Sequence, residues 1–397
     1  MVTKLETLQA ERGDITAAAQ ASRAVAVFDS FEAARADWAE LYAICAASPY
    51  QSYQFVSTWF DTVGREELLE PFIIVARAPD GRPQALLPLA LDSRGPLRIA
   101  TFMCGRESNF NLGLFRPGLR LEEAGARGLL ADAAREAIRR PDLYYLRNQP
   151  RRFEGVDNPF AFADARPSAS FAYSVALPAS AAELDARVSK DTRKKLRKKE
   201  ARLRELGELR YEHRASGARA LEIVGALIAQ KSARLAERGV SSLFESAGMR
   251  DFLERLGGAS GDGALEVHGL SLSGRIVATY AGLIRGGRFS ALLNSFDMDE
   301  EIARCSPGDL LLHALMRDLV ARGMSHFDLG AGEARYKNAV CDETIELCDA
   351  LTPVTFRGAL AAPALSWFLQ VKRRIKQTPW MARCAARLRR RLAAVPR

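Results

Sequence analysis

The feature that most constrains the fold is an order of elements that occurs twice along the chain. In each half, the pattern predicts a β-hairpin, a further strand, a loop with Pro-Gly, a helix and another strand. The hairpin turns at Gly81 and Gly274 are 193 residues apart, and Gly118 and Gly308 of the Pro-Gly loops are 190 apart. Such an offset indicates a degenerate duplication, although strand-helix-strand units also resemble one another by chance. The 397 residues have room for two such domains.

The predicted elements define a mixed-sheet α/β (α+β) fold class. The first half is expected to contain a helix at 31–47, strands at 71–78, 84–91 and 97–103, a helix at 121–139 and a strand at 142–148. For the second half we expect helices at 218–238 and 246–256, strands at 264–272, 275–284 and 288–296, a helix at 309–322 and a strand at 325–330. The segments TIELCDAL and PVTFRG are candidates for two further strands.

The predicted domain boundaries follow this repeat. They are a flexible lead at 1–25, an N-terminal domain at 26–180, a basic linking helix at 181–210, a C-terminal domain at 211–357 and a basic amphipathic tail at 358–397.

The net charge of +9 is the sum of unlike regions. Residues 186–204 contain 10 Lys or Arg and 2 acidic residues, and residues 351–397 contain 11 Lys or Arg and no acidic residue. The rest of the chain has 36 basic and 46 acidic residues. An acidic body with two basic segments argues against a general nucleic-acid-binding surface.

The cysteines and the N-terminus point to a cytoplasmic protein. The six cysteines form no Cys-x-x-Cys or Cys/His zinc spacing, and their scatter suits buried thiols in a reducing compartment. The four histidines, His213, His268, His313 and His326, have no ligand spacing either, so we expect no metal site. The first residues lack the apolar core of a signal peptide.

Two motifs in the second half can carry chemistry. The first is Ser306-Pro307-Gly308-Asp309-Leu310-Leu311, where a helix N-terminus suits a phosphate; alternatively, Ser306 is a plain helix cap. The second runs from Phe327-Asp328-Leu329-Gly330 through Gly332-Glu333 to Tyr336-Lys337.

With the basic run Arg193–Lys198, these motifs resemble GNAT-type acyltransferases, in particular the subgroup with CelD, associated with cellulose biosynthesis, and BioF2-like acetyltransferase domains. The likeness covers about 25–357 and is strongest over 190–340. Tandem domains of this kind are similar to the FemAB-like peptidyltransferases. The resemblance therefore implies tandem GNAT-like domains, each a mostly antiparallel twisted sheet flanked by helices, with a degenerate N-terminal copy that helps to shape the acceptor groove.

The resemblance implies an acyl-CoA donor, acetyl-CoA or another, whose pyrophosphate lies over the backbone N–H groups of Ser306 to Leu311. The chain departs from the usual Q/R-x-x-G-x-G/A pattern, because Asp309 and Leu310 follow the central Gly308. A carboxylate beside a pyrophosphate is unfavourable unless it caps the helix or points away.

The expected reaction is direct attack of an amine or hydroxyl on the thioester. Backbone N–H groups near Asn294 are candidate oxyanion donors, Tyr336 is the candidate acid for the thiolate, and Asp328 and Glu333 are candidate bases or amine binders. Lys337 is a candidate for binding an anionic substrate group or a phosphate of coenzyme A. The structural alternatives are that Asp328 caps a turn, that Tyr336 is a half-buried ring and that Lys337 is a solvated charge. An acyl-cysteine route through Cys305 or Cys341 has no paired base in the sequence.

The two basic segments have alternative readings. Residues 186–204 are either a solvated connecting helix or a rim that attracts coenzyme A phosphates, an anionic precursor or tRNA; without interleaved aromatics, sequence-specific DNA binding is not expected. The tail at 366–397, with Met381, Cys384, Ala385, Leu388 and Leu392 on one face, either docks on an anionic membrane surface or packs on the acidic body.

These observations predict a cytoplasmic acyltransferase, either free or peripheral at the inner face of the membrane, that modifies an envelope or exopolysaccharide-related acceptor. The acceptor class comes from the family resemblance. Two alternatives stay open. One is an aminoacyl-tRNA-dependent peptidyltransferase of the FemAB kind, and the other is a non-catalytic accessory protein of an envelope polysaccharide synthesis complex.

Overall fold

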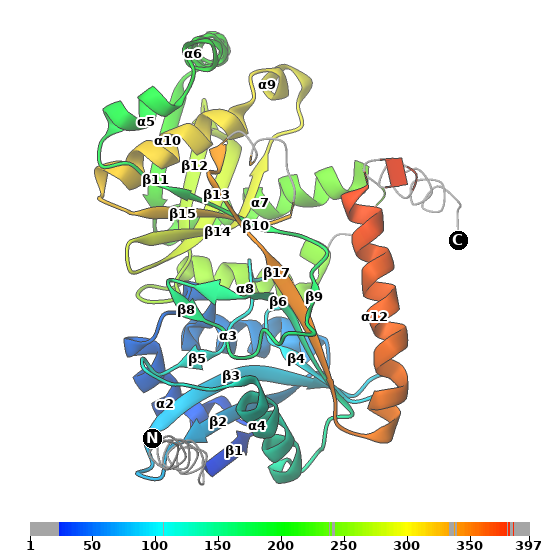
Figure 1. Cartoon of the computed structure of the whole chain (residues 1–397). Coiled ribbons are helices and arrows are strands. Elements are labelled where there is room, and N and C mark those ends of the chain that lie inside the picture. The colour runs from blue at the N-terminus through cyan, green and yellow to red at the C-terminus, as the bar shows by residue number, and fades with distance from the viewer. Residues whose placement is uncertain are drawn as a thin grey trace, which may run out of the picture.

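The computed structural model describes residues 24–105, 107–237, 239, 243–332, 337, 340–378, 380–381 and 384, which build two large sheets and their flanking helices (Figure 1). The predicted fold class, a mixed α/β architecture with mostly antiparallel sheets, is confirmed. Of the predicted lead, residues 1–23 lie outside the described residues, whereas Ala24 and Val25 belong to the first strand.

The first sheet has the strand order β1-β2-β3-β4-β6-β17-β9, with β5 paired to β3. Only β4 and β6 pair in parallel. Gly81, with φ of 84°, allows the predicted turn between β2 and β3. The strands are β1 (Ala24–Phe28), β2 (Glu70–Arg77), β3 (Pro83–Asp92), β4 (Ile99–Phe102), β5 (Leu114–Phe115), β6 (Leu143–Pro150), β9 (Arg166–Pro167) and β17 (Leu347–Pro353).

The second sheet repeats this order as β11-β12-β13-β14-β15-β10-β16, and again one pair, β14 with β15, is parallel. Gly274, with φ of 86°, allows the second predicted hairpin turn. The strands are β10 (Ala172–Ala176), β11 (Leu209–Ala215), β12 (Glu266–Leu272), β13 (Arg275–Arg285), β14 (Arg288–Phe296), β15 (His326–Ala331) and β16 (Glu343–Ile345); β7 (Arg152–Phe153) and β8 (Val156–Asp157) form a separate hairpin.

The two halves exchange one strand each. β10 precedes the basic helices in the chain, yet it pairs antiparallel with β15 of the second sheet. β17 follows the second sheet in the chain, yet it pairs antiparallel with β6 of the first sheet. The predicted unit 26–180 therefore carries one strand of the second sheet, and 211–357 carries one strand of the first. The halves cannot separate without breaking both ladders.

Helices fill the space between the sheets and cover their outer faces. One buried core joins the inner helices of both halves, as in the contact between Phe55 and Phe252, whose ring centroids are 5.3 Å apart. The inner helices are α2 (Phe31–Ile44), η1 (Pro49–Gln51), α3 (Tyr53–Trp59), η2 (Phe60–Gly64), α7 (Gly217–Glu237), η3 (Leu243–Glu245) and α8 (Ala247–Gly258). The others are α4 (Glu123–Glu136) on the first sheet, α5 (Ala181–Arg187), α6 (Lys190–Glu205), α9 (Glu300–Arg304) and α10 (Pro307–Ala321) around the second, and α12 (Phe356–Gln377) beside β17.

Three local predictions need correction. The segment PVTFRG starts α12 instead of a strand, because Thr355 caps the helix by accepting a hydrogen bond from the Gly358 N–H. The predicted single linking helix is two helices, and Ser189 caps the second of them. The two Pro-Gly loops are not equivalent: Gly118 is in a left-handed turn before α4, whereas Gly308 is helical and Ser306 is left-handed, with φ of 49°.

Candidate functional site

The site lies where two parallel strands of the second sheet separate. β14 and β15 pair at three positions that end with Ser290 opposite Asp328. β14 then continues to Phe296 while β15 diverges, and a cavity of about 340 Å³ lies beside the separated strands. It is lined by Asn109, Lys231, Arg234, Leu235, Tyr280, Ala291, Leu292, Leu293, Asn294, Leu329, Gly330, Ala331, Gly332 and Lys337.

A β-bulge re-aims β14 at this cavity. Ala281 of β13 is opposite Leu293 and Gly282 is opposite Ala291, so Leu292 is the extra residue. Beyond Ser290, no described strand pairs with the β15-side edge of β14. An unpaired strand edge offers backbone N–H and carbonyl groups to a ligand.

Two side chains of the first half anchor this edge. Tyr50 Oη donates toward the carbonyl oxygens of Ala291, at 2.9 Å, and Ser290, at 3.2 Å. Asn109 Nδ2 donates to the same Ala291 oxygen at 3.1 Å. Burial, together with the nearby Asp328 carboxylate, raises the pKa of Tyr50 well above its ordinary value, so the phenol stays a donor. The first half thus forms one wall of the site.

The cavity has a positive lining. Lys231 Nζ donates to the Asn294 carbonyl at 3.1 Å, and the Arg234 guanidinium lies 4.8 Å from the centroid of the Phe296 ring. Lys337 is buried, and its Nζ donates to the Gly330 carbonyl at 2.9 Å. Among the described lining residues three are cationic and none is acidic, which favours an anionic or carbonyl-bearing ligand.

A second, mostly apolar chamber of about 190 Å³, with Glu107 and Ser108 as further polar lining residues, adjoins the first. The two chambers share Asn109, Leu292, Leu293 and Ala331. The other lining residues include Phe244, Met249, Phe252 and Leu253, from η3 and α8. A charged group and an apolar group of one substrate, or of two, can therefore lie side by side at the bulge.

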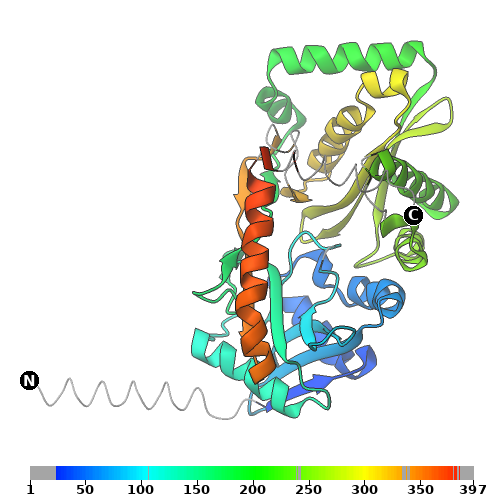
Figure 2. The ribbon, with the colours of Figure 1, turned by 90° about the vertical axis from the view of Figure 1, so that its right-hand side faces the viewer.

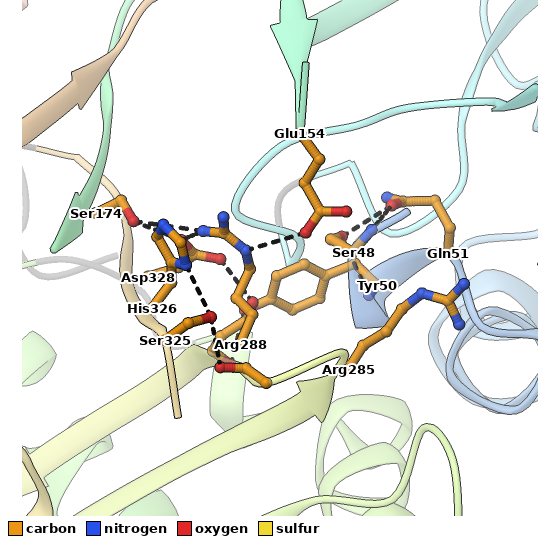
Figure 3. A network of polar contacts seen from close by, with 12 residues as sticks. Ser48, Tyr50, Gln51, Glu154, Ser174, Arg285, Arg288, Ser325, His326 and Asp328 are labelled. Atoms are coloured by element: carbon orange, nitrogen blue, oxygen red, sulfur yellow. Dashed lines mark hydrogen bonds and ion pairs between the residues drawn. The ribbon is translucent and has the colours of Figure 1, made fainter. Parts of the chain in front are cut away.

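The structure places Asp328 in a buried network beside the cavity, rather than in its lining (Figure 3). Its carboxylate is 2.6 Å from Arg288 Nη1 and accepts hydrogen bonds from Ser174 Oγ at 2.9 Å and Ser290 Oγ at 2.8 Å. Glu154 of the first half lies 3.5 Å from Arg288 Nε. These partners occupy the carboxylate. Asp328 is therefore better suited to positioning the strands than to acting as a base.

Apart from Ser306 to Asp309 at the start of α10, the other predicted site residues divide into three groups. Asn294 and Lys337 line the cavity. The side chains of Leu310 and Leu311 are buried in the core, so only their backbone faces the helix start. Glu333 and Tyr336 lie outside the described residues.

At the start of α10, the candidate for contacting a phosphate is the N–H group of Gly308. Pro307 has no N–H, and the N–H groups of Asp309 and Leu310 donate to the Ser306 carbonyl at 3.0 and 3.3 Å. The atoms nearest to a Cβ at Gly308 would be those of Phe296, at 3.5 Å or more. Lys199 Nζ of α6 lies 2.7 Å from Ser306 Oγ and 3.6 Å from Asp309 Oδ2, so the predicted conflict of Asp309 with a phosphate is offset by a cation.

Histidines and cysteines lie elsewhere. His213 Nδ1 and His268 Nδ1 are 3.3 Å apart, and His268 Nε2 is 3.0 Å from Glu266, on β11 and β12 and away from the cavity lining. With Asp318, the two histidines form a group whose potential metal-ligand atoms lie within 4.8 Å of one another. The sequence spacing did not reveal this group. Burial raises the pKa of Cys341 to about 11, which disfavours a thiolate nucleophile.

The sequence missed Tyr50, Asn109, Lys231 and Arg234. The first two reach the site from a distance of more than 180 residues along the chain. No short motif surrounds them, and only the polar run Ser108–Asn111 next to a predicted strand offered a signal.

Comparisons with known proteins identify the fold. Residues 190–338 match the family model described as "Acetyltransferase (GNAT) domain". No curated protein sequence matches this chain.

Three solved structures are similar over both halves. FemX shares 10% identity with a TM-score of 0.55, covering 83% of this chain and 97% of that chain. A C-terminal domain (DUF2156) from Agrobacterium fabrum, described as part of a lysylphosphatidylglycerol synthetase, shares 14% with a TM-score of 0.51, covering 86% and 96%. L-PGS from Bacillus licheniformis shares 12% with a TM-score of 0.50, covering 87% and 98%. Residues 190–338 are thus similar to a GNAT-type acetyltransferase domain, within a fold that the chain shares with these structures.

Proposed function

We propose that the chain transfers an acyl group from acyl-CoA to an amine or hydroxyl, at the junction of the two chambers. The observation that carries this proposal is the open edge of β14, with its bulge at Leu292, beside a cavity in the half that matches the acetyltransferase model. An open strand edge can hydrogen-bond the two amides of a pantetheine arm.

The pyrophosphate of coenzyme A is proposed to lie at the start of α10. The Gly308 N–H and the helix dipole supply positive potential, Lys199 offsets the charge of Asp309, and a Cβ at Gly308 would be in ordinary van der Waals contact with Phe296, at 3.5 Å. From there β14 leads to the bulge, so the thioester would lie near Leu292–Asn294. Side chains of Leu310 and Leu311 contribute by packing the helix onto the sheet.

In the proposed reaction the nucleophile's lone pair attacks the thioester carbonyl, the C–S bond breaks, and the thiolate takes up a proton. Backbone N–H groups of Leu292 to Asn294 stabilise the oxyanion. Glu333 accepts the proton of the nucleophile, and Tyr336 protonates the thiolate. Asp328 positions Arg288 and the paired ends of β14 and β15.

The acceptor is proposed to enter from the side of the first half, where Asn109 and the apolar chamber meet the bulge. Lys231, Arg234 and Lys337 would bind an anionic group of the acceptor or donor. The resemblance to CelD and BioF2-like domains favours an envelope or exopolysaccharide precursor, and the proposal includes a cytoplasmic location, where acyl-CoA is available.

Calorimetry with acetyl-CoA and free coenzyme A tests the donor. We expect 1:1 binding that Gly308→Glu abolishes, because the new carboxylate would occupy the phosphate site. The matched control is Gly225→Glu on the exposed face of α7, where a Cβ meets nothing within 4 Å. Absence of binding at millimolar concentration, or equal binding by both variants, would overturn the proposal.

A FemAB-like, aminoacyl-tRNA-dependent transfer is a second candidate, favoured by helix α6. Only Leu203 of its 16 residues is buried, and Lys194, Lys195 and Lys198 are exposed on a helix that stands clear of the sheets (Figure 2). Such a surface suits a polyanion. Tight, salt-sensitive tRNA binding that is lost when these three lysines become Gln would favour this candidate over acyl-CoA.

A further inference from the structure

Helix α12 has a row of large apolar side chains exposed to solvent. Phe356, Leu360 and Trp367 are 77%, 66% and 68% exposed, and Phe368 is 56% exposed. At 100° per residue, the first three lie within about 40° of one another around the helix axis. Every exposed Phe or Trp among the described residues lies between 356 and 380, whereas Trp38 and Trp59 are buried.

This stripe is long and lies on the outside of the molecule. α12 has 22 residues and therefore extends for about 33 Å. It lies along one flank, from the first half toward the second, and its outer side is uncovered in the view of Figure 2. Its inner side contacts β17 and β6. An exposed apolar stripe of this length marks an interaction surface.

Three cations of the same helix make polar contacts with uncharged groups of the body. Arg357 donates to the Pro96 carbonyl, Arg373 to the Ser168 carbonyl at 3.2 Å, and Lys376 to Ser170 Oγ at 2.7 Å. None of these partners is a carboxylate. The segment 351–397 contains 11 Lys or Arg and no acidic residue, so it has no acidic side chain of its own to neutralise this charge.

We propose that α12 docks parallel to the surface of an anionic lipid bilayer. Phe356, Leu360, Trp367 and Phe368 enter the headgroup boundary, and the basic residues at the C-terminal end of the helix contact lipid phosphates. Trp and Phe at one face with Lys and Arg beside them are the composition of an interfacial helix. Among the described residues, no helix is long and apolar enough to cross a bilayer.

The observations favour a lipid surface over a second copy of this chain. A self-complementary interface would place like charges of two α12 helices near each other, because the segment has no acidic residue to pair with them. An anionic bilayer satisfies the apolar and the basic residues together. The inference does not depend on the proposed transfer reaction, since no acyl donor takes part in it.

Flotation of the full chain with vesicles tests the inference. We expect binding to phosphatidylcholine vesicles that contain phosphatidylglycerol and little binding to phosphatidylcholine alone. The double variant Trp367→Ser with Phe368→Ser should partition at least about tenfold more weakly. Both side chains are exposed, so circular dichroism should show an unchanged fold.

The matched control replaces two exposed apolar residues elsewhere, Leu68→Ser with Ile138→Ser, which are 73% and 95% exposed. It should bind like the wild type. On anionic vesicles, Trp fluorescence should shift to the blue. The shift should shrink in Trp367→Phe, because Trp38 and Trp59 are buried and the exposed Trp380 is then left to respond. Equal flotation of both double variants, binding that ignores lipid charge, or a dimer dissolved only by the α12 variant would overturn the inference.

Discussion

The two halves use the same opening between parallel strands in different ways. In the first sheet β4 and β6 pair at three positions, ending with Thr101 opposite Tyr145. In the second sheet β14 and β15 also pair at three positions, ending with Ser290 opposite Asp328. The strand order is the same on both sides of this pair. The backbone architecture alone therefore does not make a site.

The difference lies in what fills the gap. In the first half the loop after β4 turns back into the opening, and the Asn111 N–H donates to the Asn148 carbonyl at 2.9 Å. Asn111 Nδ2 donates to the Arg147 carbonyl at 2.9 Å, and Phe110 is fully buried. In the second half the gap remains a cavity of about 340 Å³.

The filling loop also serves the open half. Asn109, two residues before Asn111, points the other way and donates to the Ala291 carbonyl. A degenerate copy that has lost its own cavity thus completes the cavity of its partner. Changes at matched positions of the two halves should separate these roles.

Asp328→Asn should destabilise the fold by about 3–5 kcal/mol, because it leaves the buried Arg288 guanidinium without its closest carboxylate. The matched change in the first half is Tyr145→Phe, which removes one long hydrogen bond to Asp349, at 3.4 Å, and should cost less than about 1 kcal/mol. Urea denaturation measures both. Equal losses would show that the two strand ends are energetically alike.

Acid should destabilise the protein through Glu266 of the second half. Burial alone would raise the pKa of Glu266, but hydrogen bonds and charges from His268 and Arg322 outweigh it and lower the pKa from 4.5 to about 2. Between pH 4.5 and 2, Glu266 therefore binds a proton in the unfolded chain but not in the folded one. The stability that this residue provides above pH 4.5 is lost as the pH falls through that window. The expected loss in the free energy of unfolding is about 3 kcal/mol.

Melting temperatures between pH 6 and 2.5 provide the measurement. Glu266→Gln should flatten this dependence, whereas Glu136→Gln, on the exposed surface of α4, should leave it unchanged. A profile that both variants share with the wild type would exclude Glu266 as the source.

The sequence predicted what depends on neighbours in the chain. Apolar alternation and the Gly81 and Gly274 turns located both hairpins, and the Pro-Gly helix start located α10. It did not predict β10, a five-residue strand whose partner β15 lies some 150 residues away. The exchange of β10 and β17 is decided by which sheet edge each segment meets in space, and local periodicity carries no such information.

The site shows the same division. Asn294, Gly308 and Lys337 belong to local motifs, and the structure brings Asn294 and Lys337 to the cavity. The role of Asp328 could not be predicted, because its partners Arg288 and Ser174 come from other strands. A carboxylate has the same appearance in a sequence whether it faces a ligand or a buried guanidinium.

Gly330→Ala should cost about 2–3 kcal/mol. Its φ of 84° is left-handed, and a Cβ would lie 2.4 Å from Asn109 Oδ1. Gly118→Ala in the first half has nearly the same φ, 83°, but nothing within 4 Å, so it should cost only about 1 kcal/mol. Adding Asn109→Ala should recover part of the loss at residue 330 and none at residue 118. A double-mutant cycle without this coupling would contradict the contact between the halves.

Asn111→Ala should have the smallest effect, about 1 kcal/mol, since it removes one hydrogen bond to the Arg147 carbonyl while the backbone bond to Asn148 persists. Coenzyme A affinity should not change, because the residue fills only the first half. Asn109→Ala removes one bond of the same kind, to the Ala291 carbonyl, and should cost similar stability. It should also alter ligand binding, because this carbonyl lies at the bulge. Calorimetry on the two variants compares two asparagines of one loop, and equal affinities would mean that the first half supports the cavity without shaping it.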